Sequence, residues 1–174
     1  MEKKFNVRQT TITLSTLALL TALLIVISMF CTIKTEIVNI TLTFIPVVIA
    51  ARLYGAAGAA AVAGLGDFIG WVVRPLGAFY PPITVTAMIV GVIFGLFLKN
   101  SSSFLRILAS VLITQFIFSA FVTPIWLHLL YDYPYFPTVI ARIPQILIMT
   151  AIELIVIPIM LKALDKIKAA KLIS

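Results

Sequence analysis

Residues 11–31 read TITLSTLALLTALLIVISMFC, a run without a single charged side chain. The charge-free stretch is longer still, because the nearest charged residues are Arg8 and Lys34. About 20 consecutive apolar residues form a helix long enough to cross the hydrocarbon core of a bilayer. The run is too long for the apolar segment of a secretory signal peptide, and no small-residue cleavage site follows it. We therefore predict a first membrane span over residues 11–31.

The rest of the 174-residue chain has the same apolar character. Hydrophobic residues make up 62% of it and charged residues only 11%, whereas an ordinary soluble domain has about 25% charged residues. This composition leaves too little polar surface for a water-soluble globule, and it also excludes a disordered chain and a soluble nucleic-acid-binding domain. The single cysteine, Cys31, cannot form an intrachain disulfide, and we interpret it as a small apolar side chain.

Breaks in the apolar runs divide the chain into six predicted spans. Leu53–Gly55 has the composition of a turn, Arg74-Pro75 ends a helix because the residue before proline avoids the α conformation, and residues 100–103 form a polar loop. The second span is short and contains Pro46, so we expect it to be tilted or partly irregular. The predicted spans cover residues 11–31, 38–52, 55–73, 83–98, 104–130 and 138–161. We predict an all-α integral membrane protein, a single membrane domain over residues 1–174 in the lipid bilayer.

The distribution of lysine and arginine predicts the orientation of the spans. With the N-terminus inside, ten of the 13 basic residues fall in inner segments and three in outer segments. The inner ones are Lys3, Lys4, Arg8, Arg52, Lys99, Arg106, Lys162, Lys166, Lys168 and Lys171, and the outer ones are Lys34, Arg74 and Arg142. Cytoplasmic loops carry an excess of lysine and arginine, so we predict that both termini are cytoplasmic. Topology thus explains most of the net charge of +7, and no nucleic-acid partner is needed.

The three outer cations lie near a group of aromatic residues. This group comprises Trp71, Phe79, Tyr80, Trp126, Tyr131, Tyr133, Tyr135 and Phe136. One interpretation is an interfacial belt of the kind that borders many membrane proteins. The other is an outward-facing pocket in which aromatic faces and cations bind a flat, anionic small molecule.

Asp67 favours the pocket, because a carboxylate within an apolar helix is costly unless it is paired or hydrated. Asp67, Trp71 and Arg74 are spaced i, i+4, i+7, so they share one helix face. Arg142 and Gln145 likewise lie one turn apart in the last span. The alternative role for Asp67 is a structural ion pair with Arg142 or Arg74.

Two further titratable residues are not assigned to the pocket. Glu153 lies deeper in the last span, and we expect it to form a hydrogen bond inside the bundle. His128 has no identifiable catalytic partner, and we interpret it as an interfacial residue.

The sequence contains no GxxxxGK[ST] phosphate-binding loop, no HExxH metal motif and no GxSxG nucleophile motif. We therefore expect no metal, no cofactor, no ATP binding and no catalysis; an intramembrane enzyme using Asp67 or His128 would need a second catalytic group.

Small residues recur at four-residue spacing in several spans. Ala18 and Ala22 form such a pair in the first span, and Gly66–Gly70 and Gly91–Gly95 are GxxxG motifs. Ridges of small residues let helices approach closely in lipid. We expect most of these ridges to pack within this bundle.

Five segments of the chain resemble one known family. They are residues 54–70 (YGAAGAAAVAGLGDFIG), 74–86 (RPLGAFYPPITVT), 91–97 (GVIFGLF), 126–131 (WLHLLY) and 141–145 (ARIPQ). In combination they are similar to the S components of energy-coupling factor (ECF) vitamin importers, most of all the folate-specific branch, over about residues 10–165. Ala18 and Ala22 lie where S components carry an AxxxA docking motif.

The resemblance implies a substrate-binding subunit of the bacterial cytoplasmic membrane. Such a subunit takes folate, or a folate-like vitamin, from outside and delivers it through a membrane T component and two cytoplasmic ATPase subunits. Under this hypothesis Asp67 accepts hydrogen bonds from the pterin edge, aromatic residues wall the ring, and cations meet the glutamate carboxylates; Gln145 also belongs to the site. The aromatic residues are Trp71, Phe79, Tyr80 and Trp126, and the cations are Arg142, Arg74 and Lys34. The alternatives are the same fold with another vitamin or precursor, and a structural subunit, which leaves Asp67 unexplained.

Overall fold

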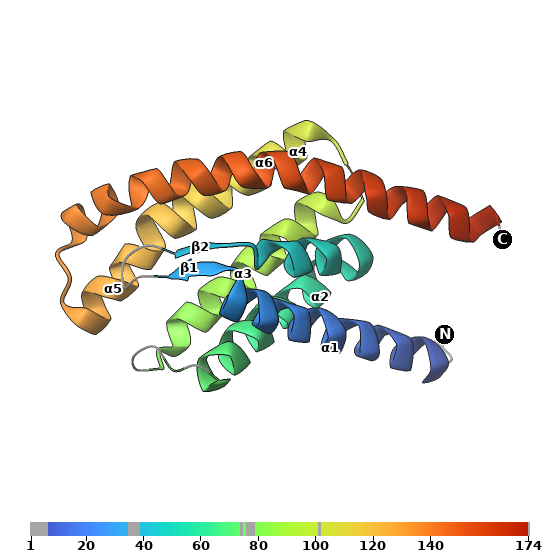
Figure 1. Ribbon diagram of the computed structural model, residues 1–174, viewed down its shortest axis with the longest axis horizontal. Coiled ribbons are helices and arrows are strands. Elements are labelled where there is room, and N and C mark those ends of the chain that lie inside the picture. Colours follow the sequence, from blue (N-terminus) through green and yellow to red (C-terminus); the bar gives the residue numbers. More distant parts are fainter. Residues whose placement is uncertain (1–6, 35–38, 74, 76–78, 101, 174) are drawn as a thin grey trace, which may run out of the picture.

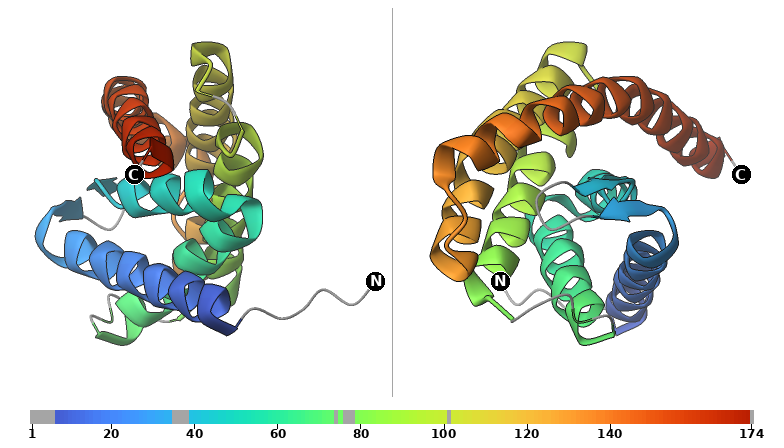
Figure 2. Two further views of the ribbon diagram at one scale, coloured as in Figure 1. Left: turned by 90° about the vertical axis from the view of Figure 1, so that its right-hand side faces the viewer. Right: turned by 60° about the vertical axis from the view of Figure 1, so that its left-hand side comes forward.

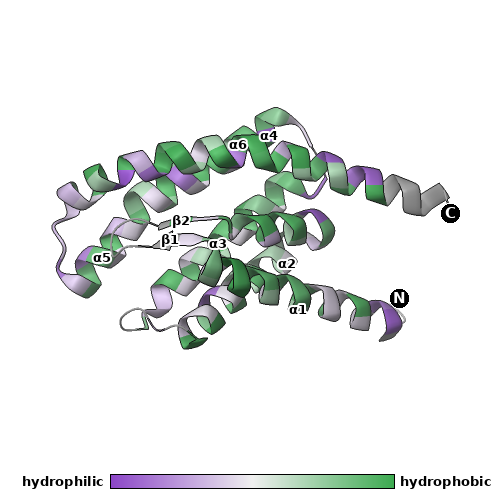
Figure 3. Ribbon diagram, in the orientation of Figure 1, coloured by the Kyte–Doolittle hydropathy of each residue, from purple (hydrophilic) through white to green (hydrophobic). Residues whose placement is uncertain are grey.

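The computed structural model describes residues 7–34, 39–73, 75, 79–100 and 102–173. Its elements are α1 (Val7–Phe30), β1 (Thr32–Lys34), β2 (Asn39–Thr41), α2 (Phe44–Val73), α3 (Pro81–Leu98), α4 (Phe104–Leu112), the π-helix η1 (Ile113–Val122), α5 (Thr123–Tyr131) and α6 (Tyr135–Ile173). Five helical stretches of the described chain are long and apolar enough to cross a bilayer: Arg8–Phe30, Phe44–Val73, Pro81–Leu98, Phe104–Tyr131 and Tyr135–Ile167. Apolar residues predominate along all of them (Figure 3). The prediction of a helical, multi-pass membrane fold is confirmed at this level.

α2 contains a sharp break where the sequence predicts a turn at Leu53–Gly55. Gly55 has φ 76° and ψ −157°, outside the helical region, and glycine adopts a positive φ without the steric cost of a side chain. The helical segments before and after Gly55 run in opposite directions (Figure 1). The predicted span over residues 38–52 needs correction at its start, because residues 39–41 form a strand and the helix begins at Phe44.

A short β-hairpin joins α1 to α2, and the all-α prediction does not include it. β1 and β2 pair antiparallel, with Thr32 opposite Thr41 and Ile33 opposite Ile40. The Thr32 hydroxyl donates a hydrogen bond of 2.7 Å to the Thr41 hydroxyl. Three residues per strand are too few to show an alternating pattern in the sequence, so hydropathy alone does not reveal the hairpin.

The predicted span over residues 104–130 is one continuous helical rod with an irregular middle. α4 leads directly into η1, and η1 leads into α5. In a π-helix the backbone hydrogen bonds run from i to i+5, and such segments occur frequently at functional sites. The rod ends at Asp132, which has φ 54° and donates its N–H to the carbonyl of His128 at 3.0 Å.

The beginning of α1 and the end of α6 lie at the same end of the molecule (Figure 1). This end also holds the C-terminus of α3. We call it the inner end, a name for this arrangement of the helices and not for a side of the membrane. The opposite, outer end holds the hairpin, the start of α3 and the connection from α5 to α6. Figure 2 shows α6 curving over the other helices. Pro144 and Pro158 lie inside α6, and each removes one backbone hydrogen bond, which favours bending.

An ion pair with several hydrogen bonds ties the inner end together. Arg52 lies at the end of the first segment of α2, and its Nη2 is 2.6 Å from the Asp165 carboxylate on α6. Its Nη1 donates to the carbonyls of Leu98 at 2.9 Å and Lys99 at 3.0 Å. Ser102 donates to the same Asp165 carboxylate at 2.7 Å. Three segments that are far apart in sequence therefore meet at one guanidinium group.

The Gly91–Gly95 motif packs α3 directly against α2. A Cβ atom at Gly91 would lie 2.6 Å from the carbonyl oxygen of Ala59, and one at Gly95 would meet the backbone of Ala56. Gly70 differs, because nothing lies within 4 Å of the position that its Cβ would occupy. The expectation that glycine ridges pack within this bundle is confirmed for Gly91 and Gly95.

We predict that Gly91→Ala destabilises the protein and that Gly70→Ala does not. The added methyl group at Gly91 presses on a backbone carbonyl, which cannot rotate away, and overpacking of this kind costs about 1–3 kcal/mol. At Gly70 the methyl group meets open space, and alanine is a better helix former by about 1 kcal/mol. Melting temperatures in one detergent measure both effects. Equal shifts for the two variants would contradict the packing that we describe.

Candidate functional site

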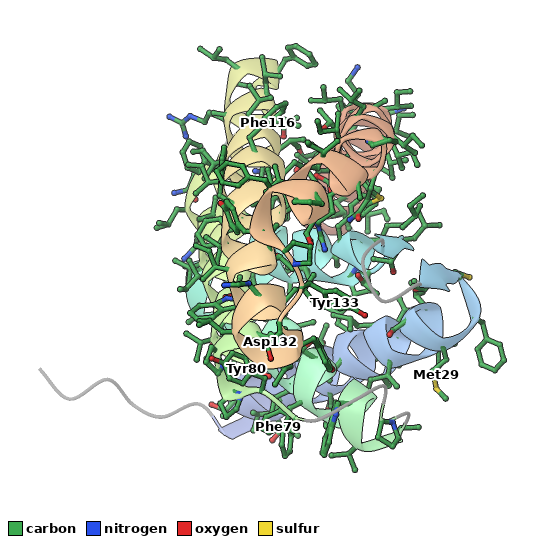
Figure 4. All side chains as sticks on the ribbon, turned by 90° about the vertical axis from the view of Figure 1, so that its left-hand side faces the viewer. Met29, Phe79, Tyr80, Phe116, Asp132 and Tyr133 are labelled. Carbon is green, nitrogen blue, oxygen red and sulfur yellow. The ribbon has the colours of Figure 1, made fainter. Side chains whose placement is uncertain are left out.

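A cavity of about 450 Å³ lies between the helices and the hairpin. Small-molecule sites typically have volumes of roughly 300–1,000 Å³. Its polar lining consists of Ser28, Thr32, Thr41, Thr43, Asp67, Thr84, Thr86, Thr114, Gln115, Ser119, Thr123, Arg142, Gln145 and Glu153. Its aromatic lining consists of Phe44, Trp71, Phe79, Tyr80, Phe94, Phe118 and Tyr131. Figure 4 faces the outer end, where Phe79 and Tyr80 lie below Asp132, and Met29 of α1 lies to one side of them.

The structure brings together most of the residues that the sequence predicts for a ligand site. Those that line the cavity are Asp67, Trp71, Phe79, Tyr80, Arg142 and Gln145. They come from the second segment of α2, the two residues just before α3 and the outer part of α6. Arg74 and the side chain of Lys34 lie outside the described residues, so their part in the site stays a prediction.

Asp67 is anchored to the neighbouring helix. Its Oδ2 accepts a hydrogen bond of 2.7 Å from the hydroxyl of Thr84 on α3. The side chain is half-buried and lines the cavity. The hydrogen bond from the threonine therefore offsets part of the free-energy cost of an acid in an apolar helix. It also holds the carboxylate in one orientation.

The aromatic wall has two layers at the outer end. Trp71 and Phe79 pack with ring centroids 5.0 Å apart. Tyr80 packs against Trp126 with centroids 5.8 Å apart, and the Trp126 indole N–H donates to the Thr86 hydroxyl at 3.0 Å. Tyr80 and Thr86 belong to the lining, so Trp126 supports the wall from behind rather than facing the cavity itself.

Arg142 and Gln145 place two polar side chains on the cavity-facing side of α6. Both are 5% exposed. Nη2 of Arg142 donates to the hydroxyl of Ser119 on η1 at 3.3 Å. A buried guanidinium is costly to desolvate, and in membrane proteins such groups commonly mark a substrate path. Its position in the wall suits an anionic group of a ligand.

The cavity also contains a buried pair of polar side chains from η1 and α6. Gln115 donates from Nε2 to Oε1 of Glu153 at 2.6 Å, and the two residues are 8% and 3% exposed. The prediction that Glu153 forms a hydrogen bond inside the bundle is confirmed. The prediction from the sequence did not include Gln115, although a long amide within an otherwise apolar span was a usable signal. It also did not place Glu153 beside a ligand cavity.

The alanine pair of α1 faces away from the bundle. Ala18 and Ala22 are exposed, whereas Leu20 and Leu24 on the same helix are buried. The pair is therefore not used for packing within the described chain. Small residues on an outward face leave room for a close helix–helix contact with another protein.

Comparisons with known proteins all match vitamin transporters, although their names give two different vitamins. A profile of the family described as "ECF-type riboflavin transporter, S component" matches residues 8–166. The folate transporter FolT of Clostridium novyi (strain NT) is 31% identical over 153 residues, which cover 87% of this chain and 89% of the relative. A folate transporter FolT of Leuconostoc mesenteroides is 31% identical over 144 residues, covering 79% and 77% of the two chains.

A solved structure shares the fold. The crystal structure of FolT bound with folic acid superposes with a TM-score of 0.82 and covers 87% of this chain and 94% of its own. The two sequences are 24% identical, so this likeness concerns the fold.

Proposed function

Because the chain belongs to the family of ECF-type transporter S components, which are transport subunits and not enzymes, we propose that it captures folate or a folate-like vitamin. The observation that carries this proposal is one cavity lined by aromatic rings, a buried arginine and carboxylates. Folate combines a flat pterin ring, whose amino-pyrimidine edge donates hydrogen bonds, with a glutamate tail that carries two carboxylates. The cavity offers a complementary group to each part.

In this proposal different side chains of the cavity bind the two ends of folate. Asp67 accepts the hydrogen bonds of the pterin edge, and Arg142 meets the glutamate tail through charge-assisted bonds, which are stronger than neutral ones. Gln145 lies beside Arg142 and adds a polar contact. The aromatic wall consists of Trp71, Phe79 and Tyr80, with Trp126 behind it. Arg74 and Lys34 complete the cationic end.

Riboflavin is the second candidate, because the matching family profile carries that vitamin in its description. The pyrimidine edge of a flavin presents carbonyl oxygens on both sides of its ring N–H, and it has no amino group. A carboxylate such as Asp67 would repel those oxygens. Riboflavin also lacks a carboxylate for Arg142. These two contacts favour a pterin over a flavin.

The proposal includes the topology and the partners. We propose that the chain crosses the bacterial cytoplasmic membrane six times, with both termini in the cytoplasm. The reversal at Gly55 supports six crossings rather than five, and the common position of the start of α1 and the end of α6 supports an even number (Figure 1). A T component and two ATPase subunits would supply the energy, and the outward-facing pair Ala18 and Ala22 supports docking on such a partner.

Ligand binding by the purified chain tests the proposed function. We expect the detergent-solubilised protein to bind folic acid at one molecule per chain and to bind riboflavin far more weakly, as measured by isothermal titration calorimetry. We also expect no saturable binding of ATP, because the sequence has no phosphate-cradling loop. Preference for riboflavin would shift the assignment to the second candidate. Binding of neither vitamin, or saturable ATP binding, would contradict the proposal.

A further inference from the structure

Glu153 carries a buried oxygen that the described part of the chain leaves without a hydrogen-bond partner. This atom is Oε2; the other carboxylate oxygen, Oε1, is held by Gln115. The residue is 97% buried, since only 3% of its surface is exposed, and it lines the cavity. Leaving a buried polar group unsatisfied costs roughly 1–3 kcal/mol, and more when the group is charged. Such an atom in a cavity wall indicates a ligand donor.

No described side chain donates a hydrogen bond to Oε2 of Glu153. The hydroxyl of Thr114 is directed to the backbone carbonyls of Ser110 at 2.9 Å and Val111 at 3.1 Å. Phe94 and Met149, which line the same cavity, have no side-chain N–H or O–H to give. Gln115 fixes the orientation of the carboxylate through Oε1, which leaves Oε2 as the atom to be satisfied by a ligand.

Glu153 lies on the same side of α6 as Arg142, but deeper. The two residues are 11 positions apart, which is about three turns and roughly 16 Å along the helix axis. Both line the cavity, so its α6 wall has a cation toward the outer end and an acid toward the inner end. A ligand that satisfies both groups is elongated, with anionic groups at one end and N–H groups at the other.

We propose that Glu153 is a ligand-binding residue, whose Oε2 accepts a hydrogen bond from the exocyclic amino group of the vitamin. This inference rests on the proposed function. A pterin edge carries three N–H bonds, one on the ring and two on the amino group. A single carboxylate such as Asp67 takes one of each, so the second amino N–H needs another acceptor. Glu153 supplies it, and the pterin therefore enters first while the glutamate tail stays near Arg142.

Two ligands and one isosteric substitution test this role. The ligands are folic acid and an analogue in which a methyl group replaces the 2-amino group; both compete against labelled folic acid. Glu153→Gln keeps the shape of the side chain and replaces the carboxyl group with an amide. We expect folic acid affinity to fall roughly tenfold to hundredfold. Affinity for the methyl analogue should change by less than about threefold, because the analogue has no amino hydrogen bond to lose.

Ser110→Ala is the matched control, because Ser110 is fully buried outside the cavity lining and also makes an internal hydrogen bond, of 2.8 Å to Ile107. It should leave both affinities unchanged. Gln115→Ala is the second variant: it frees the carboxylate to rotate, so it should weaken folic acid more than the analogue. It decides the question if Glu153→Gln does not yield folded protein.

Three outcomes are separable. Selective loss of folic acid affinity supports the assignment. Unchanged folic acid affinity, or equal losses for both ligands, overturns the role of Glu153 while the proposed function stands. Failure of the wild-type protein to bind folic acid at all contradicts the proposed function itself.

Discussion

Replacing Ala18 or Ala22 with tryptophan is expected to abolish vitamin transport while leaving vitamin binding intact. Both alanines are exposed on the side of α1 that faces away from the bundle. Leu20 and Leu24 are buried and hold this helix in the bundle. A bulky side chain there would keep a partner helix from the close approach that small residues allow. Uptake of labelled vitamin by vesicles containing the whole transporter measures transport, and titration of the isolated chain in detergent measures binding.

Ile159→Trp is the control for this prediction. Ile159 is 63% exposed on α6, so the substitution puts an equally large ring on another lipid-facing helix. Transport should survive it. Loss of transport in all three variants would mean that any bulky group on the apolar surface blocks assembly, and survival of transport in the alanine variants would remove their docking role.

Arg142→Ala and Asp67→Asn are each expected to weaken vitamin binding roughly tenfold to hundredfold, as is usual when one partner of a charge-assisted bond is lost, about 1.5–3 kcal/mol. The two variants should differ in which of two ligands they weaken more. If Arg142 meets the glutamate tail as proposed, its loss should weaken folic acid more than a pterin without that tail. If Asp67 binds the pterin edge as proposed, its loss should weaken both ligands about equally. Titration of both ligands against both variants measures the difference.

The alternative is a purely structural role for these two residues. Asp67 accepts a hydrogen bond from Thr84, and Arg142 donates one to Ser119. Either substitution therefore also removes an internal hydrogen bond. A structural role predicts a large drop in the melting temperature without ligand and no change in ligand preference. Thr84→Val serves as the control, because it removes the contact to Asp67 and leaves the carboxylate in place. Equal losses of both ligands in Arg142→Ala, together with a large drop in melting temperature, would exclude the ligand contact.

The sequence predicts the helical framework well. Apolar runs mark the segments that can lie in lipid, and prolines and charges mark where those segments end. The predicted span over residues 104–130 corresponds to a continuous rod from Phe104 to Tyr131, and the turn predicted at Leu53–Gly55 coincides with the break at Gly55. The hairpin of β1 and β2 escapes prediction because its strands are short. The π-helix escapes it because hydropathy does not report which carbonyl an N–H selects.

The candidate site is predictable only where a residue is out of place in its span. Asp67 and Arg142 stand out because ionised groups are rare in apolar helices, and both line the cavity. Gln115 is uncharged and attracts less notice, although it makes a short bond to an acid across the bundle. The sequence shows that Glu153 needs a partner, but which of its two oxygens is satisfied depends on how η1 and α6 meet in space.

The pair of Gln115 and Glu153 also has a consequence for biogenesis. A carboxylate at the centre of a helix opposes insertion from the translocon by about 2.5–3.5 kcal/mol. Gln115 precedes Glu153 by 38 residues, so the amide is synthesised first and its helix leaves the ribosome before α6 does. When α6 enters the membrane, the partner for its acid is therefore already present. This order along the chain allows the amide to meet the acid as α6 enters the membrane.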